Sequence, residues 1–92
     1  MSALSLQLSR HVGRFIKTLP PKQYKQVVST ILALANDPTP HDSKLLKGSK
    51  QRNRRVDVGE YRVVYRVEND ALLVLVAGKR NDDDVYKKLD RL

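Results

Sequence analysis

The sequence contains no cysteine, and this absence excludes disulfide bridges, thiolate catalysis and cysteine-based zinc sites. The longest apolar stretch runs from Ala71 to Ala77 and is far too short to cross a bilayer. The beginning of the chain lacks a basic segment followed by a continuous apolar run, so it does not resemble a signal peptide. We therefore expect a protein of the reducing cytoplasm that has no membrane partner.

The common catalytic patterns are absent as well. The sequence has neither a glycine-rich phosphate loop nor an HExxH motif, and nothing in it resembles a nucleophile elbow. The two histidines, His11 and His41, are far apart in the sequence, so each is better interpreted as an ordinary surface or helix residue than as a metal ligand. We expect neither a cofactor nor a metal ion.

Positive charge is what the chain has in excess. Its 92 residues carry eighteen Lys and Arg against ten Asp and Glu, a net charge of +8. Clustered cations on a small domain attract polyanions and speed their capture. The alternative is a solvated surface that only keeps the protein soluble. The segment from 44 to 66 holds +6 of the excess, because Asp57 and Glu60 alone oppose eight cations: Lys44, Lys47, Lys50, Arg52, Arg54, Arg55, Arg62 and Arg66.

Hydrophobic periodicity predicts a single α+β domain over residues 1–92. Alternating leucines predict a strand with one buried face over 3–8, and a helix over 10–17 follows, capped by Ser9. A second helix begins at the prolines 20–21 and ends at Asn36. Its apolar residues lie at helical spacing and form one stripe: Tyr24, Val27, Val28, Ile31, Leu32 and Ala35.

The second half of the chain predicts three strands and a short last helix. The strands cover 52–58, 61–67 and 71–77, after a loop over 37–50, and the helix covers 82–92. We therefore expect two N-terminal helices packed on one face of a small, largely antiparallel four-stranded sheet, with a short C-terminal helix. The other face should be uncovered and rich in arginine, a surface on which a flexible nucleic acid could lie.

Four arginines are the best candidates for chemistry. Arg55, Arg62 and Arg66 lie on two adjacent predicted strands, and Arg80 follows the third. Arginine presents five donors in a planar fork that matches phosphate oxygens two at a time. Several such forks around one phosphate would stabilise the charge that develops in phosphoryl transfer. For Arg66, the alternative is a salt bridge with Glu68 or Asp70 of its own hairpin.

At this point the sequence resembles a known family, the RelE/ParE toxins of bacterial toxin–antitoxin pairs. The resemblance covers almost the whole chain and is strongest from Asp37 to Leu89. It is specific because of the joint order and spacing of four segments: LLKG at 45–48, GEYRVVYRV at 59–67, AGKR at 77–80 and VYK at 85–87.

The resemblance to RelE implies a RelE-like fold and a ribosome-dependent endoribonuclease that cuts messenger RNA in the A site without a metal. The 2′-hydroxyl of the messenger attacks the neighbouring phosphate. The family's pattern then places Arg55 near that hydroxyl, Arg62 on the phosphate, Arg80 as a second phosphate contact or proton donor, and Tyr86 against the nucleotide. Further cations are expected to bind the RNA: Lys47, Lys50, Arg52, Arg54 and Arg66. The implied partners are a RelB-like antitoxin, the ribosome with its messenger, and operator DNA through the toxin–antitoxin complex.

Two departures from the RelE pattern affect the mechanism. Asn53 and Arg55 stand where RelE has lysines, and an arginine cannot act as a classical base because it does not lose its proton. Asp57 could accept a proton or form an ion pair with Arg55. Tyr86 could instead be an amphipathic tail residue that covers the core.

Two other functions remain open on the sequence. The first is a ParE-like inhibitor of DNA gyrase with no enzymatic activity of its own. Gyrase-directed relatives generally lack the arginine after the third strand together with the terminal tyrosine, and this chain has both, as Arg80 and Tyr86. The second is an inactive relative that binds only its antitoxin and operator DNA.

Overall fold

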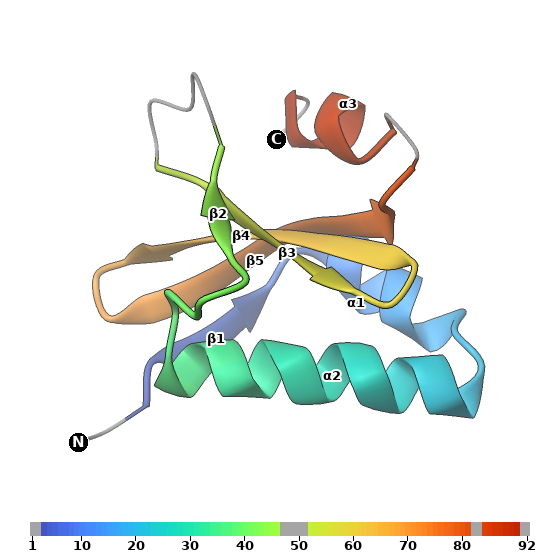
Figure 1. Ribbon diagram of the computed structural model, residues 1–92, viewed down its shortest axis with the longest axis horizontal. Helices are drawn as coiled ribbons and strands as arrows, with labels where there is room; N and C mark the ends of the chain where they lie inside the picture. The colour runs from blue at the N-terminus through green and yellow to red at the C-terminus, as the bar shows by residue number, and fades with distance from the viewer. Residues whose placement is uncertain (1–2, 47–51, 82–83, 91–92) are drawn as a thin grey trace.

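Along the described chain, one strand is followed by two helices, four strands and a last helix (Figure 1). The computed structural model describes residues 3–46, 52–81 and 84–90. No helix within these ranges is both long enough and apolar enough to cross a membrane. The elements are β1 (Ser5–Leu8), α1 (Arg10–Lys17), α2 (Pro21–Asn36), β2 (Lys44–Leu45), β3 (Arg54–Val58), β4 (Tyr61–Glu68), β5 (Ala71–Lys79) and α3 (Asp84–Asp90).

The sheet has five strands in the order β1-β5-β4-β3-β2, so the expected number of four is wrong. The additional strand, β2, has two residues and pairs with β3 inside the segment that the sequence predicted as a loop. Two residues are too few to produce a recognisable alternation, so no pattern in the sequence indicated this strand. The sheet is mixed, because β1 runs parallel to β5 while the other neighbours are antiparallel.

Two tight turns fix the register of the three long strands. Asn69 and Asp70 have φ angles of 51° and 63°, as a two-residue type I′ turn between β4 and β5 requires. Gly59 has a φ of 59° at the first position of the turn between β3 and β4, where glycine bears no steric penalty. The turns therefore set which residues of adjacent strands lie opposite each other.

The sheet carries a large core on one face and a small one on the other. In Figure 1, α2 runs along one side of the sheet and α3 lies on the opposite side. The large core joins buried residues of α1, α2 and the strands: Val12, Val27, Ile31, Leu34, Ala35, Val56, Val58, Tyr61, Val63, Tyr65, Leu72, Val74 and Ala77. The small core joins Val64 and Val76 to Val85 of α3. From the sequence, the second face was expected to be uncovered. This expectation is wrong for its β4–β5 part, because α3 packs there.

An irregularity in β5 anchors the first helix. Val64 pairs with Val76 and Tyr65 pairs with Val74, so Leu75 is an extra residue in β5, a β-bulge. Its carbonyl accepts a hydrogen bond from Ser9 Oγ at 2.6 Å. Ser9 Oγ in turn accepts a hydrogen bond from the Val12 amide at 3.1 Å. Ser9 is thus the N-cap of α1, as predicted, and it also ties the helix to the sheet.

The first strand is more exposed than the sequence suggested. Leu6 and Leu8 are 38% and 39% exposed, so the prediction of a buried face holds only for Leu4, which packs against the large core. The reason is position, because β1 is an edge strand and the two N-terminal helices lie mainly over the inner strands.

Candidate functional site

The centre of the site is Arg62 on β4, which lies on the α3 side of the sheet. Its Nε donates to Asp57 Oδ1 at 2.8 Å, and its Nη2 donates to Asp57 Oδ2 at 3.4 Å. Its Nη1 donates to the hydroxyl oxygen of Tyr86 at 2.6 Å. The Arg62 side chain is 17% exposed. One guanidinium therefore joins three elements: β3, β4 and α3.

Asp57 reaches Arg62 across the β3–β4 hairpin, because the two residues lie directly opposite each other. The ion pair with Arg55, one of two roles considered for Asp57 from the sequence, is present, with Arg55 Nη1 4.0 Å from Asp57 Oδ1. The contact of Arg62 is shorter. The hydrogen bond from Arg62 holds the pKa of Asp57 below its usual value, helped by the charges of Arg62, Arg55 and Arg80 and opposed by desolvation. Asp57 is therefore a carboxylate at neutral pH and a weak proton acceptor.

Tyr86 owes its position to its neighbour in the sequence. Val85 is 2% exposed and packs on Val64 and Val76, which seats α3 on the sheet. Beneath it lies Gly78, the residue of β5 opposite Arg62. A Cβ at position 78 would lie 2.9 Å from Val85 Cγ2, so the close approach of α3 depends on glycine. Val85 thus covers the core, and Tyr86 is turned toward Arg62.

The Tyr86 ring also lies near the Arg62 guanidinium, with its centroid 6.0 Å from Cζ. The tyrosine hydroxyl accepts a hydrogen bond from Arg62, so its own proton points away from that guanidinium. The pKa of Arg62 is raised, first by its hydrogen bonds to Asp57 and then by Tyr86, against desolvation. Arg62 is therefore a permanent cation that can stabilise negative charge and cannot serve as a base.

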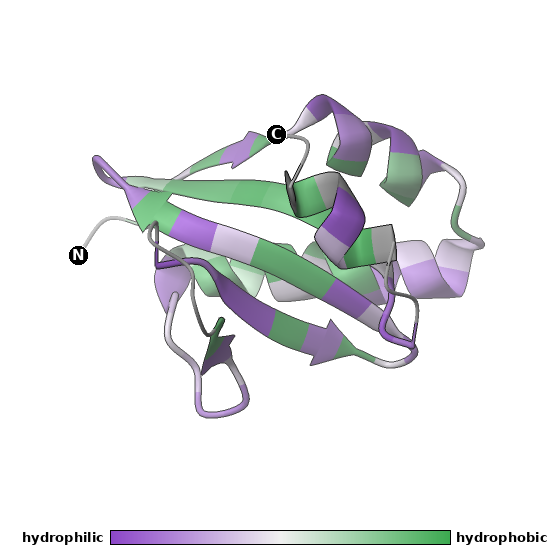
Figure 2. Cartoon of the chain, turned by 90° about the horizontal axis from the view of Figure 1, so that it is seen from above, coloured by the Kyte–Doolittle hydropathy of each residue, from purple (hydrophilic) through white to green (hydrophobic). Residues whose placement is uncertain are grey.

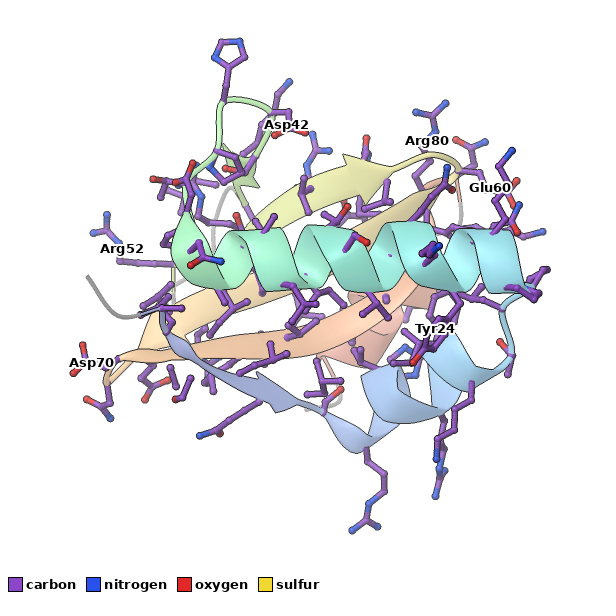
Figure 3. All side chains as sticks on the ribbon, turned by 90° about the horizontal axis from the view of Figure 1, so that it is seen from below. Tyr24, Asp42, Arg52, Glu60, Asp70 and Arg80 are labelled. Atoms are coloured by element: carbon purple, nitrogen blue, oxygen red, sulfur yellow. The ribbon has the colours of Figure 1, made fainter. Side chains whose placement is uncertain are left out.

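Arg80 lies at the same end of the sheet as the turn between β3 and β4. Figure 3 shows it beside Glu60, and the Arg80 amide donates to the Glu60 carbonyl at 2.9 Å. Its side chain is exposed, and its charge reaches Asp57 strongly enough to lower the pKa of that carboxyl. Asp57 thus contacts Arg55 and Arg62, Tyr86 contacts Arg62, and the charge of Arg80 acts on the same carboxylate.

The other cations predicted to bind RNA do not all converge on this place. Arg54 shares the strand face of Val56 and Val58, away from Arg62, and two of its nitrogens donate to Ser43 Oγ at 3.3 and 3.0 Å. The expectation of a single cationic face therefore fails for Arg54, because strand residues alternate between faces.

Of the four remaining cations, two lie within the described residues, Arg52 and Arg66. Arg52 lies at the end of the molecule opposite Arg80 (Figure 3). The Arg66 Nε donates to Glu68 Oε2 at 3.0 Å, which is the salt bridge weighed from the sequence. Lys47 and Lys50 lie outside the described residues.

The chemistry of the site is that of fixed positive charge. Figure 2 looks down on this face and shows hydrophilic bands on β3 and β4 beside an almost continuously hydrophobic β5. Within the described ranges, no three or more His, Cys, Asp or Glu side chains gather as metal ligands. The arrangement is suited to bind an anion that has several oxygens, because guanidinium groups match such an anion in shape and charge.

The sequence is similar to those of known toxins. Residues 5–83 match the family described as the ParE toxin of the type II toxin–antitoxin system parDE. A protein of Methanocaldococcus jannaschii that carries the toxin name RelE1 is 30% identical over 86 residues, which are 90% of this chain and 94% of that one.

Solved structures share the fold at low sequence identity. The archaeal RelE–RelB complex of Pyrococcus horikoshii has a chain that matches with a TM-score of 0.76 and 22% identity, over 86% of this chain and 97% of that one. Free E. coli toxin RelE matches with a TM-score of 0.76 and 19% identity over 99% of both chains. The fold is therefore RelE-like, and the chain belongs to the ParE/RelE family of toxins from type II toxin–antitoxin systems.

Proposed function

We propose that this toxin is a ribosome-dependent endoribonuclease that cleaves messenger RNA in the A site. The observation that carries the proposal is the fixed Arg62, held between Asp57 and Tyr86 with Arg55 and the charge of Arg80 nearby. These are the residues to which the resemblance to RelE assigns the reaction. Their cations would fill the role that a metal ion has in other nucleases.

In the proposed reaction, the 2′-oxygen of the messenger bonds to the adjacent phosphorus and the bond from phosphorus to the 5′-oxygen breaks. The 2′-hydroxyl proton is released, and the leaving 5′-oxygen takes up a proton, which gives a 2′,3′-cyclic phosphate and a free 5′-hydroxyl. Arg62 and Arg80 stabilise the additional negative charge on the phosphate oxygens. Arg55 favours ionisation of the 2′-hydroxyl by its charge, and Tyr86 orients the nucleotide.

The proposal includes partners and a location. Chains that match in fold come from complexes of RelE with RelB. A RelB-like antitoxin that covers the arginines would silence this toxin. The complex would bind operator DNA, and the free toxin would act in the cytoplasm, on the ribosome, and arrest growth.

A second candidate function is inhibition of DNA gyrase without any chemistry. The match to the family described as the ParE toxin of parDE favours it, because that family model covers most of the chain. The presence of both Arg80 and Tyr86 favours the nuclease.

Primer extension on cellular messengers after a short induction separates the two functions. We expect new 5′ ends inside translated regions that disappear when translation initiation is blocked. Arg62→Ala should abolish these ends, since loss of one positioned donor costs about 10²–10³ in rate. Arg14→Ala, which removes an exposed cation from α1, is the matched control and should cleave normally. Growth arrest with intact messengers would favour gyrase.

A further inference from the structure

Asp57 binds one edge of the Arg62 guanidinium through a bidentate contact. Both carboxylate oxygens are used, because Nε donates to Oδ1 at 2.8 Å and Nη2 donates to Oδ2 at 3.4 Å. Nη1 donates to the Tyr86 hydroxyl at 2.6 Å. These contacts engage three of the five N–H groups of an arginine. One N–H on Nη1 and one on Nη2 have no partner assigned among the described residues and can bind a ligand.

The carboxylate itself is held by the backbone. Asp57 and Arg62 are directly opposed in the β3–β4 hairpin, only a few residues from the tight turn at Gly59. Opposed residues on one sheet face have Cβ atoms about 4.5–5.5 Å apart, so their side chains meet without a long reach. The position of the Arg62 guanidinium is therefore set by the register of the hairpin.

A second arginine on the same strand provides the contrast. The ion pair of Arg66 joins its Nε to one oxygen of Glu68 at 3.0 Å, and that glutamate side chain is 52% exposed, against 35% for Asp57. Arg62 is held by both oxygens of a less exposed carboxylate and by a tyrosine. Glu68 is thus a natural control, since its removal changes the net charge by the same amount.

We propose that Asp57 is a positioning residue, which fixes Arg62 so that its two remaining N–H groups face the scissile phosphate beside Tyr86. This inference rests on the proposed nuclease function, because it is the phosphate of a cleaved messenger that Arg62 would meet. A guanidinium that is held in advance loses less rotamer freedom when the phosphate binds and sits closer to the geometry of the transition state.

The opposite role for the same carboxylate predicts effects of the opposite sign. If Asp57 were a competitor that occupied the place of the phosphate, its removal would free Arg62 and tighten binding of the messenger. If it positions Arg62, its removal slows the chemical step and leaves binding nearly unchanged, because Arg55 and Arg80 still attract the backbone.

Single-turnover cleavage of a ribosome-bound messenger decides between these roles. We expect Asp57→Ala to lower the rate at saturating ribosomes by about 100-fold, with half-saturation changed by less than about threefold. Asp57→Asn keeps one acceptor oxygen and should lose about tenfold. Glu68→Ala should cleave at the normal rate. Faster cleavage or tighter half-saturation in Asp57→Ala would overturn the proposal, as would a rate equal to that of Glu68→Ala.

A readout that requires no cleavage keeps this inference separate from the proposed function. In NMR spectra of the purified protein, we expect the Arg62 Nε–H to exchange slowly with solvent and to exchange about tenfold faster in Asp57→Ala. The Arg66 Nε–H is the internal reference, which should respond to Glu68→Ala and not to Asp57→Ala. An unchanged Arg62 signal in Asp57→Ala would refute positioning. Absence of cleavage by the wild-type chain, with the Arg62 signal behaving as expected, would refute the nuclease and leave Asp57 as the group that holds Arg62.

Discussion

Neighbouring residues of β4 face opposite sides of the sheet, and the two sides differ in composition and in burial. Tyr61, Val63 and Tyr65 face the helices, and Tyr65 is fully buried with its hydroxyl donating to the Pro38 carbonyl at 2.7 Å. Arg62 and Arg66 face the other way, on either side of the buried Val64. A single strand therefore separates the residues that stabilise the fold from those that could act on a ligand, and substitutions on the two faces should have separable effects.

The largest effect is expected in the helix-side core. Leu34 of α2 is 1% exposed, so Leu34→Ala should lower the free energy of unfolding by about 3 kcal/mol, through lost burial and the cavity that remains. Leu32→Ala on the same helix is the control, because Leu32 is 52% exposed and its truncation should change stability by less than about 0.5 kcal/mol. Urea unfolding measures both. Equal losses would mean that the helix packs differently.

A smaller loss of stability is expected where α3 packs on β5. Gly78→Ala places a Cβ 2.9 Å from the buried and stiff Val85, so it should destabilise the protein by about 1–2 kcal/mol and displace Tyr86. Gly13→Ala in α1 is the matched control. A Cβ there meets no atom within 4 Å, and alanine in a helix should stabilise by about 0.5–1 kcal/mol. Thermal unfolding measures both variants, and the NMR signals of the Tyr86 ring report its displacement. A gain of stability in both variants would contradict this.

Removing one hydroxyl from the site should cost still less. Tyr86→Phe leaves the ring in place but deletes the acceptor of the Arg62 Nη1 hydrogen bond. The free energy of unfolding should fall by about 0.5–1 kcal/mol, because Arg62 keeps its contacts with Asp57. Tyr24→Phe on the exposed side of α2 is the comparison and should be neutral. A larger loss in Tyr86→Phe would mean that the tyrosine, rather than Asp57, holds the arginine.

The smallest effect is a dependence on pH. The pKa of Asp57 is lowered from 3.8 in the folded protein, so the ion pair contributes stability above the pKa of the unfolded chain and loses it as pH falls through the lower folded value. The difference in unfolding free energy between the wild type and Asp57→Asn should be less than about 1 kcal/mol at pH 7, since the pair is partly exposed. Denaturant titrations at pH 7 and pH 3 should show this difference shrink in acid. A difference that grows in acid would contradict the assignment.

The sequence predicted every element of the fold except β2, whose two residues are too few to form a pattern. The second helix, the three long strands and the cap at Ser9 are confirmed to within a few residues. The helical stripe was shifted, because Tyr24 and Leu32 are exposed while Leu34 is buried. Spacing gives the width of an apolar face, and only the packed sheet determines where its centre lies.

The residues of the site were predicted from the sequence, but one of the contacts between them was not. The predicted strands and their charge selected Arg55, Arg62 and Arg80 as candidates, and the resemblance supplied Tyr86. The contact between Asp57 and Arg62 was not predicted, because only Arg55 on the same strand was considered, whereas the hairpin register sets Asp57 opposite Arg62. Register depends on the turn at Gly59, and a turn one residue longer would have paired Asp57 with another residue.

The bulge at Leu75 determines what lies beneath the last helix. If Leu75 were paired in the ladder, the part of β5 that follows it would advance by one position, and Ala77 instead of Gly78 would lie opposite Arg62. The methyl group of that alanine would then occupy the space into which Val85 now fits. Because Leu75 is left out of the strand pairing, Gly78 lies under α3 and leaves room for Val85. The carbonyl of Leu75 also accepts the hydrogen bond that holds the start of α1 on the other side of the sheet.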